Sequence, residues 1–183
     1  MARPIKKGLE YFPFDVGFFS DKKVKILKSR YGADGIVIYQ YLLCEIYKEN
    51  GYFLIVDEDL EYIISDDLNM ESNKVKQVLN FLLERSLFDS TLFQSDKVLT
   101  SAGIQKRYQE AVKTRASKKA IVVDNYWLLS KEETASYIKV TLFEDKSEIN
   151  KHKSEINSNL SVEKKHKVKE SKVKENKEIL KQL

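Results

Sequence analysis

The fold is decided by residues 57–85, which read DEDLEYIISDDLNMESNKVKQVLNFLLER. The second half of this stretch predicts a helix from about Glu71 to Arg85, because its apolar residues recur at steps of three and four and make one buried face. These residues are Val75, Val78, Leu79, Leu82 and Leu83. The first half predicts another helix, from Asp57 to Leu68, whose acidic first turn favours the positive end of the helix dipole. Two helices joined by a short polar turn are typical of a helix-turn-helix.

The residues before this pair predict two helices and a strand. Asp21 to Tyr31 is expected to be a short helix that is capped by Asp21 and stopped by Gly32. Asp34 to Glu49 is apolar almost all round, so we expect it to lie in the middle of the domain and to bury Cys44 as an inert thiol. A short strand is expected at Tyr52–Val56.

The residues after the pair predict a small hairpin and a fifth helix. SLFDSTLF (86–93) and KVLTS (97–101) are apolar stretches separated by polar residues 94–96, and the fifth helix is expected from Ser101 to Lys118. The whole order is helix, helix, strand, helix, turn, helix and hairpin. This order predicts a mainly α fold with a small β-wing, an α+β winged helix-turn-helix.

In such a fold the second helix of the pair lies in the major groove of DNA. Asparagine, glutamine and lysine side chains read base edges or hold phosphates. The candidate residues on this helix are Asn73, Lys74, Lys76, Gln77 and Asn80. A solvated amphipathic helix explains the same residues, and the acidic helix beside it works against phosphates. Winged helices also bind proteins, so the fold alone does not decide between these interpretations.

The fifth helix carries the stronger basic signal, because from Lys106 to Lys119 the sequence sets six basic residues against Glu110 alone. The basic residues are Lys106, Arg107, Lys113, Arg115, Lys118 and Lys119. A basic helix can follow a phosphate backbone, and we expect Tyr108 to stack on a base. A solvated charged face is the alternative, and the scarcity of acidic residues favours the nucleic-acid contact.

Aromatic residues crowd the beginning of the chain. They are Tyr11, Phe12, Phe14, Phe18 and Phe19. Large aromatic side chains bury much area, so we expect this group to seal the bottom of the core and to extend into a contact with a second copy of the chain. Completion of a small core, without self-association, explains the same residues as well.

The composition argues against an enzyme and against a membrane protein. Both histidines, His152 and His166, lie in the lysine-rich C-terminal stretch, so Cys44 has no histidine partner for acid–base or nucleophilic chemistry. The acidic runs at 57–59 and 65–67 lie near the ends of one helix, where dipole and capping roles explain them without a metal. No phosphate-binding glycine loop, membrane-length apolar run or signal peptide is visible. We therefore expect no catalytic residue, metal, cofactor, small-molecule substrate or membrane contact, and the single cysteine fits a reducing cytoplasm.

Composition divides the chain near residues 120 and 145. Residues 1–119 are the predicted winged-helix domain, and residues 120–145 are an added strand or helix segment. Residues 146–183 are basic and of low complexity, with KSEIN and KVKE each occurring twice, and no apolar seam runs through them. We expect this last segment to be a disordered tail.

Several separated motifs resemble one family of phage proteins. They are ARPIKKGLEYFPFDVGFF (2–19), RYGADGIVIYQYLLCEIYKENGYF (30–53), LERSLFDSTLF (83–93) and VLTSAGIQKRYQEA (98–111). Together they resemble the opening domain of replisome-organiser and DnaD-like primosomal proteins from phages and prophages of Gram-positive bacteria. The resemblance covers about residues 2–119. It implies a winged helix that binds DNA or self-associates when phage replication begins.

We therefore expect a DNA-binding winged-helix protein of phage or prophage origin that acts in replication initiation in the cytoplasm of a bacterial host. Its expected partners are DNA, a second copy of itself and replication proteins such as a helicase loader. In longer relatives the lysine-rich tail leads into a DnaD-like domain, so this chain is expected to be a short or truncated member, which leaves the helicase-loader contact open. Three other interpretations remain. A nuclease needs a divalent metal to change the DNA itself. A transcriptional regulator needs a palindromic site and a firm dimer, and a protein-interaction module binds DNA no better when salt is lowered.

Overall fold

The structure, a computed structural model, describes residues 8–118 and 120–141. The chain divides into two compact units, residues 1–139 and 140–183, and only residues 140 and 141 of the second unit are described. The fold set out below is therefore that of the first unit. Lys119 and the predicted tail at 146–183 lie outside the described residues.

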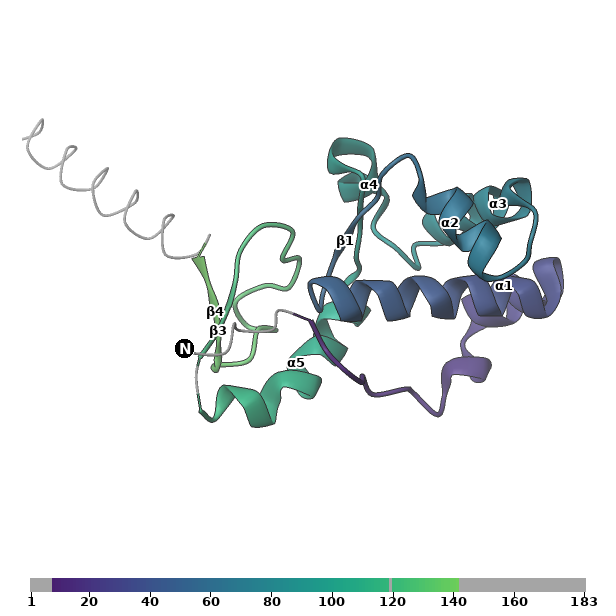
Figure 1. Ribbon diagram of the computed structural model, residues 1–183. Helices are drawn as coiled ribbons and strands as arrows, with labels where there is room; N and C mark the ends of the chain where they lie inside the picture. The colour runs from purple at the N-terminus through teal and green to yellow at the C-terminus, as the bar shows by residue number, and fades with distance from the viewer. Residues whose placement is uncertain (1–7, 119, 142–183) are drawn as a thin grey trace, which may run out of the picture. The chain divides into compact units, whose positions relative to one another are not determined.

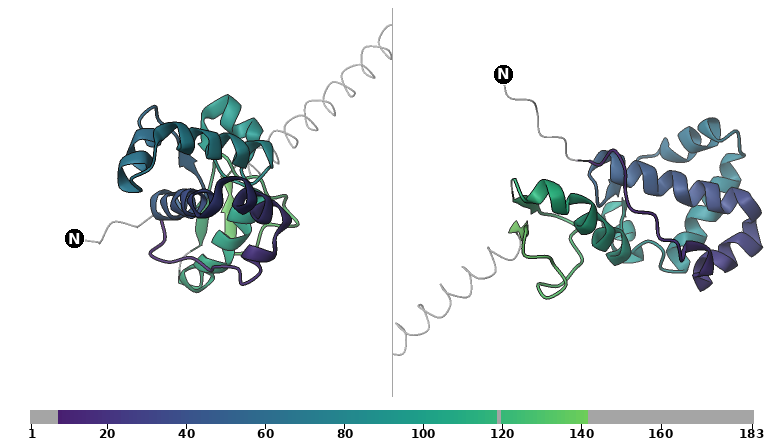
Figure 2. Two further views of the ribbon diagram at one scale, coloured as in Figure 1. Left: turned by 90° about the vertical axis from the view of Figure 1, so that its right-hand side faces the viewer. Right: turned by 90° about the horizontal axis from the view of Figure 1, so that it is seen from below.

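The described elements are mainly helices, with two sheets of two short strands each (Figure 1). In chain order they are η1 (Phe18–Ser20), α1 (Lys22–Glu49), β1 (Leu54–Ile55), α2 (Leu60–Asp67), α3 (Ser72–Glu84), α4 (Ser90–Asp96), β2 (Val98–Leu99), α5 (Ala102–Ala116), β3 (Ile121–Val123) and β4 (Ile138–Val140). This order confirms the predicted α+β class with helices in the majority. Helices α2 and α3 lie on one side of α1, and the N-terminal arm, residues 8–20, lies on the other (Figure 1; Figure 2, left).

Helix α1 consists of two helical halves that meet at Gly32. Asp21 caps the first half, because its carboxylate accepts hydrogen bonds from the backbone N–H groups of Lys23 (2.7 Å) and Val24 (3.1 Å). At Gly32 the backbone leaves the helical region, with φ 65° and ψ −148°. Only glycine adopts this conformation without strain. The second half follows at once, so the two predicted helices are confirmed as the halves of one kinked element.

The second half of α1 is the centre of the core. Its residues Ile38, Leu42 and Ile46 are buried, and α1 packs against α3, β1 and η1. The prediction that Cys44 is buried is wrong, because Cys44 is exposed. It lies seven residues after Val37, which is also exposed, and this spacing places both on the solvent side of the helix.

Helices α2 and α3 form the predicted pair, joined by a turn at residues 68–71. Within this turn Asn69 adopts a φ of 49°, which asparagine tolerates better than most residues. Helix α2 begins three residues later than predicted, because the side chain of Asp57 accepts a hydrogen bond from the backbone N–H of Asp59 (3.2 Å) in a turn before the helix. Helix α3 matches its predicted bounds to within one residue. Its buried residues are Val75, Val78, Leu79, Phe81 and Leu82.

The predicted hairpin at residues 86–101 is wrong. Residues Ser90–Asp96 form helix α4, because Asp89 caps them by accepting a hydrogen bond from the backbone N–H of Leu92 (2.9 Å). Lys97 ends this helix in the left-handed conformation, with a φ of 57°. The second stretch, β2, pairs instead with β1 in an antiparallel register of Leu54 with Leu99. The strand partner therefore comes from a distant segment rather than from its neighbour.

Two buried glutamines attach the segment after α5 to that helix. The Gln105 side chain donates to the carbonyl of Tyr126 (2.8 Å) and accepts from the N–H of Leu128 (2.7 Å). The Gln109 side chain donates to the carbonyl of Glu133 (3.2 Å) and accepts from the N–H of Ala135 (2.6 Å). Each side-chain amide thus forms hydrogen bonds with two backbone groups. Burial of these backbone groups without partners would cost free energy. Strands β3 and β4 come before and after the attached segment in the sequence, and they pair to form the second sheet.

The conformation at Gly32 predicts a large loss of stability for Gly32→Ala. A Cβ there meets no other atom within 4 Å, so the whole effect comes from the backbone conformation. We expect the free energy of unfolding to fall by about 1–3 kcal/mol in urea denaturation, because an L-residue is strained there. Gly103→Ala is the matched control, because Gly103 lies in α5 and a Cβ there meets no atom closer than 3.8 Å, so alanine should change stability there by no more than about 1 kcal/mol. Equal effects of the two substitutions would show that the kink is not held by this conformation.

Candidate nucleic-acid interface

Helix α3 presents a polar face to solvent, opposite its buried stripe. Residues Asn73, Gln77 and Asn80 repeat at steps of four and three, so their side chains share this face, and all are exposed. Lys76 is exposed beside them. Side-chain amides both donate and accept hydrogen bonds, as the edges of base pairs do. We call Asn73, Lys76, Gln77 and Asn80 the amide face.

Lys74 is placed differently from the other predicted residues of α3. Its ammonium lies 2.6 Å from a carboxylate oxygen of Asp34 in α1. This hydrogen bond raises the pKa of Lys74. Lys74 therefore joins α3 to α1, and its charge is shared with Asp34.

The first half of α1 brings further cations to the side of α3. The Lys23 ammonium donates to the carbonyl of Ser86, just after α3 (2.9 Å). The guanidinium groups of Arg30 and Arg85 lie 5.7 Å and 5.5 Å from the ring centre of Phe81, within the range of cation–π contacts. We call Lys23, Arg30 and Arg85 the cationic strip, and all three are exposed. Its contacts with Phe81 and Ser86 place it at the C-terminal end of α3, nearest Asn80 of the amide face.

Sequence reasoning missed this strip, although a signal was present. Five cations stand between Lys22 and Arg30, and no acidic residue interrupts the chain from there to Asp34. The basic run weighed from the sequence was the later one, from Lys106 to Lys119. Only the packing of α1 against α3 shows that these cations lie beside the polar face.

The other helix that packs against α3 carries the opposite charge. Helix α2 and the turn before it contain only acidic charged residues, and Tyr41 of α1 donates a hydrogen bond to the Asp67 carboxylate. The exposed acidic residues are Asp57, Glu58, Asp59, Asp66 and Asp67. An approaching phosphate is therefore attracted on the α1 side of α3 and repelled on the α2 side.

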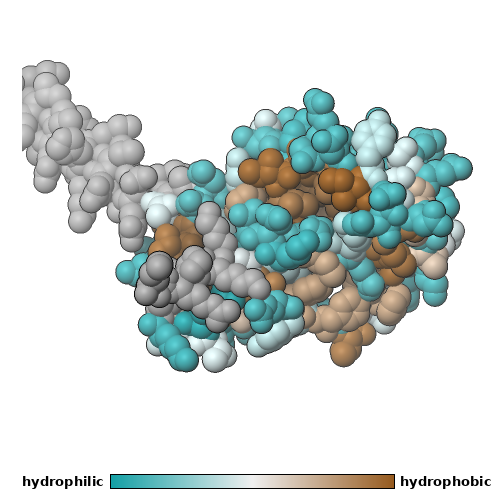
Figure 3. Space-filling model, viewed as in Figure 1, coloured by the Kyte–Doolittle hydropathy of each residue, from teal (hydrophilic) through white to brown (hydrophobic). Residues whose placement is uncertain are grey.

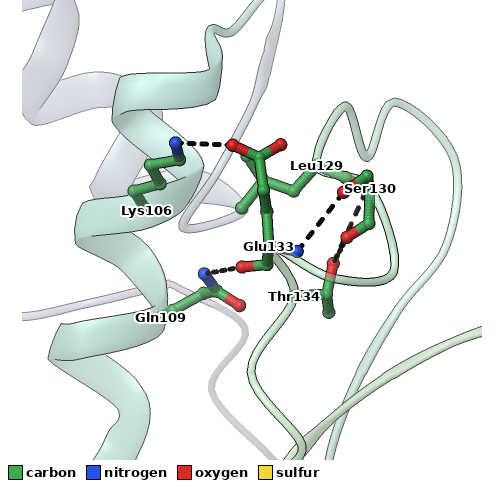
Figure 4. Close-up of polar contacts among 6 residues, drawn as sticks. All are labelled: Lys106, Gln109, Leu129, Ser130, Glu133 and Thr134. Atoms are coloured by element: carbon green, nitrogen blue, oxygen red, sulfur yellow. Dashed lines mark hydrogen bonds and ion pairs between the residues drawn. The ribbon is translucent and has the colours of Figure 1, made fainter.

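Several cations of α5 are engaged within the fold. Lys106 pairs with Glu133 (2.7 Å), and this hydrogen bond lowers the pKa of Glu133 (Figure 4). Arg107 donates to the Tyr47 hydroxyl (3.2 Å), and Arg115 donates to the carbonyl of Gly8 (3.3 Å). The remaining cations differ: Lys113 and Lys118 are exposed, and Lys119 lies outside the described residues.

A surface hollow beside α5 has a mixed charge. It has a volume of about 440 Å³, and its charged residues are two cations and two acids. They are Lys106, Arg107, Glu110 and Glu133. The charges balance, so this hollow attracts phosphate less than the cationic strip does.

The prediction that Tyr108 stacks on a base is wrong. Its side chain is only 4% exposed, and its ring lies 5.4 Å from that of Tyr52 and 6.4 Å from that of Trp127. A Cβ on Gly51 would come within 2.3 Å of the same ring, so the packing is tight. Tyr108 is a core residue, because the segment held by Gln105 covers its side of α5.

The aromatic residues of the N-terminal arm divide into two groups. Phe12 and Phe18 are half-buried, and their rings stack on Tyr47 (4.2 Å) and Tyr39 (5.9 Å) of α1. The other three are exposed: Tyr11 by 81%, Phe14 by 48% and Phe19 by 53%. Hydrophobic surface accordingly gathers over the arm, below α1 in Figure 3. Self-association through this surface stays a prediction.

Comparison with known proteins assigns the chain to a family. A family described as "Lin1244/Lin1753-like, N-terminal" matches residues 11–104. The chain belongs to this family. The "Uncharacterized phage-related protein Lin1244/Lin1753" of Listeria innocua is 35% identical to it over 184 residues, which cover 98% of this chain and 59% of that protein. The chain thus spans about three-fifths of the length of that relative. No solved structure matches.

The Lin1244/Lin1753-like region contains both the amide face and the cationic strip, since it runs from the N-terminal arm to the first turn of α5. Lys106 and the later cations of α5 lie beyond it. Within residues 8–118 and 120–141, no helix is long and apolar enough to cross a membrane. Within the same residues, no three histidine, cysteine, aspartate or glutamate side chains lie close enough together to hold a metal ion.

Burial of the tyrosines predicts a loss of stability at alkaline pH. Burial raises the pKa of Tyr39 to about 12, and it also raises the pKa values of Tyr47 and Tyr108. An unfolded tyrosine ionises near pH 10, so the free energy of unfolding is expected to be unaffected below about pH 10 and to fall as pH rises towards about 12. Urea denaturation across this range, followed with tyrosinate absorbance, measures the loss.

Tyr39→Phe is the control for this prediction. Phenylalanine has no hydroxyl to ionise, so the variant should lose part of the alkaline dependence. An unchanged dependence would show that other groups, such as lysines, cause it.

Proposed function

We propose that this Lin1244/Lin1753-like protein is a DNA-binding protein of phage or prophage origin that acts in replication initiation, with the surface of α1 and α3 facing duplex DNA. The observation that carries the proposal is the position of the cationic strip beside the C-terminal end of α3, the helix that presents the amide face. Side-chain amides without nearby cations would lack the attraction that dominates DNA affinity. Here one surface carries both.

In the proposed complex α3 lies in the major groove, where Asn73, Gln77 and Asn80 meet base edges. The cationic strip contacts the phosphates of the strand beside α1. The acidic residues around α2 set the orientation, because the reverse placement would bring them against the backbone. Lys113 of α5 and Lys118, two residues after its end, add exposed positive charge outside this surface.

The winged-helix architecture and the replication role are part of the proposal. The order of α1, β1, α2 and α3, followed by an antiparallel partner for β1, supports a winged helix in which α4 replaces one strand of the wing. The phage-related Listeria relative supports the phage origin. The motifs that resemble replisome organisers support the role in replication.

A second function is favoured by one observation on α2. Tyr62 and Ile63 are exposed there, and so is Ile55 of β1. Apolar side chains within an acidic surface suit a protein partner with a basic rim. Such a protein-interaction module would show no salt-dependent affinity for DNA.

The proposal predicts how charge reversal changes DNA affinity. Fluorescence anisotropy with a labelled mixed-sequence duplex, over a series of salt concentrations, compares the full chain with the double variant Lys23→Glu/Arg30→Glu. We expect affinity to fall by at least about tenfold and the salt slope to decrease by about 2, since each phosphate contact contributes nearly 1. The basic C-terminal residues are identical in both proteins, so their contribution cancels.

Lys131→Glu is the matched control, because it reverses an exposed charge in the segment between β3 and β4. It should change affinity by no more than about twofold. If Lys131→Glu weakens binding as much per charge as the double variant, the attraction is general and the α1–α3 surface is not the interface. If no variant and no salt concentration changes DNA binding, the protein-interaction function is favoured.

A further inference from the structure

The first half of α1 has a second charged flank, which faces away from the cationic strip. Lys25 and Lys28 are three residues apart and lie across the helix from Lys23 and Arg30. Together with Phe19 of η1 they line a surface hollow of about 450 Å³, which Val24 and Ser29 complete. Figure 2 shows this beginning of α1 and the arm from below in its right-hand view. The hollow is distinct from the amide face.

The hollow combines a supported aromatic ring with two lysines that form no ion pair. Phe19 is 53% exposed, and its ring meets that of Phe18 edge to face at 5.1 Å. Phe18 in turn stacks on Tyr39 of the core, so the ring of Phe19 is held in place from behind. No described residue forms an ion pair with Lys25 or Lys28.

No carboxylate lines the hollow. The nearby Asp21 carboxylate keeps its negative charge, but it accepts hydrogen bonds from two backbone N–H groups at the start of α1 and forms no ion pair with either lysine. The hollow beside α5 differs in this respect, because it contains Glu110 and Glu133. The two cations of the α1 hollow are therefore available to an anion from solution.

An exposed aromatic ring beside lysines fits an unpaired nucleotide. Bases stack on aromatic side chains and phosphates pair with nearby cations wherever single strands are bound, whereas a base inside a duplex has no free face to offer. A second copy of this chain fits less well, because a two-fold contact centred on the hollow would bring Lys25 and Lys28 towards the same residues of the other copy.

We propose that this hollow binds single-stranded DNA, with Phe19 stacked on an unpaired base and Lys25 and Lys28 in contact with the adjoining phosphates. The inference rests on the proposed function and extends it. The duplex-facing strip and the hollow lie on opposite flanks of one half-helix. One chain thereby holds duplex on one flank and a separated strand on the other, which suits the melting of DNA at the start of replication.

The test uses the full chain and two probes, a labelled oligothymidylate of about 16 nucleotides and the labelled duplex. Phe19→Ala should weaken binding of the oligothymidylate by about tenfold and binding of the duplex by less than about twofold. Lys25→Glu/Lys28→Glu should act in the same direction with a stronger salt dependence. Tyr62→Ala removes another exposed aromatic side chain and should change neither affinity. Phe19→Tyr keeps the ring and should retain single-strand affinity.

The outcomes separate this inference from the proposed function. Binding of duplex without binding of the oligothymidylate overturns the single-strand site and leaves the duplex interface standing. If the unsubstituted chain binds neither probe, the single-strand site and the proposed duplex interface are both overturned. A Phe19→Ala variant with unchanged single-strand affinity but a smaller mass in sedimentation overturns the inference, because the hollow is then a self-association surface.

Discussion

The backbone conformation of Gly32 determines where the cations of α1 lie. The second half of α1 is fixed by burial in the core, and at Gly32 the chain takes a conformation open to glycine alone. The first half then runs beside the C-terminal end of α3, where Tyr31 donates to the carbonyl of Gln77 (3.4 Å) and Lys23 to that of Ser86. This turn thereby sets where the cationic strip lies relative to α3. The proposed DNA interface and the hollow on the opposite flank both depend on it.

Whether a cation is paired within the fold distinguishes α1 from α5. The two glutamines of α5 hold the following segment in place, and that segment brings Glu133 to Lys106. Arg107 and Arg115 of α5, like Lys23 of α1, donate to neutral oxygen atoms of the fold, so the difference lies in the carboxylate partner of Lys106. Among the described cations of α1, Lys48 near the C-terminal end of the helix pairs with a carboxylate, and the cations before Gly32 do not. A run of basic residues is therefore a guide to an interface only after its partners are known.

Periodicity predicted the parts of the fold that depend on local sequence. The stripe of α3 and the cap at Asp21 follow from spacing and side-chain type, and both were found. The hairpin failed because the cap at Asp89 favours a helix and because the partner of β2 is far away in the chain. Cys44 and Tyr108 were misjudged because only the packed structure shows which face of a helix is covered. The amide face was predictable from the helix, whereas the strip beside it required the contact between α1 and α3.

Amide hydrogen exchange of the full chain, with and without duplex DNA, tests the central claim most directly. If the α1–α3 surface faces DNA, protection on binding is expected in residues 22–30 and in α3, with no change in α2. Protection confined to α5, or to residues after 141, would contradict the assignment of the interface to α1 and α3.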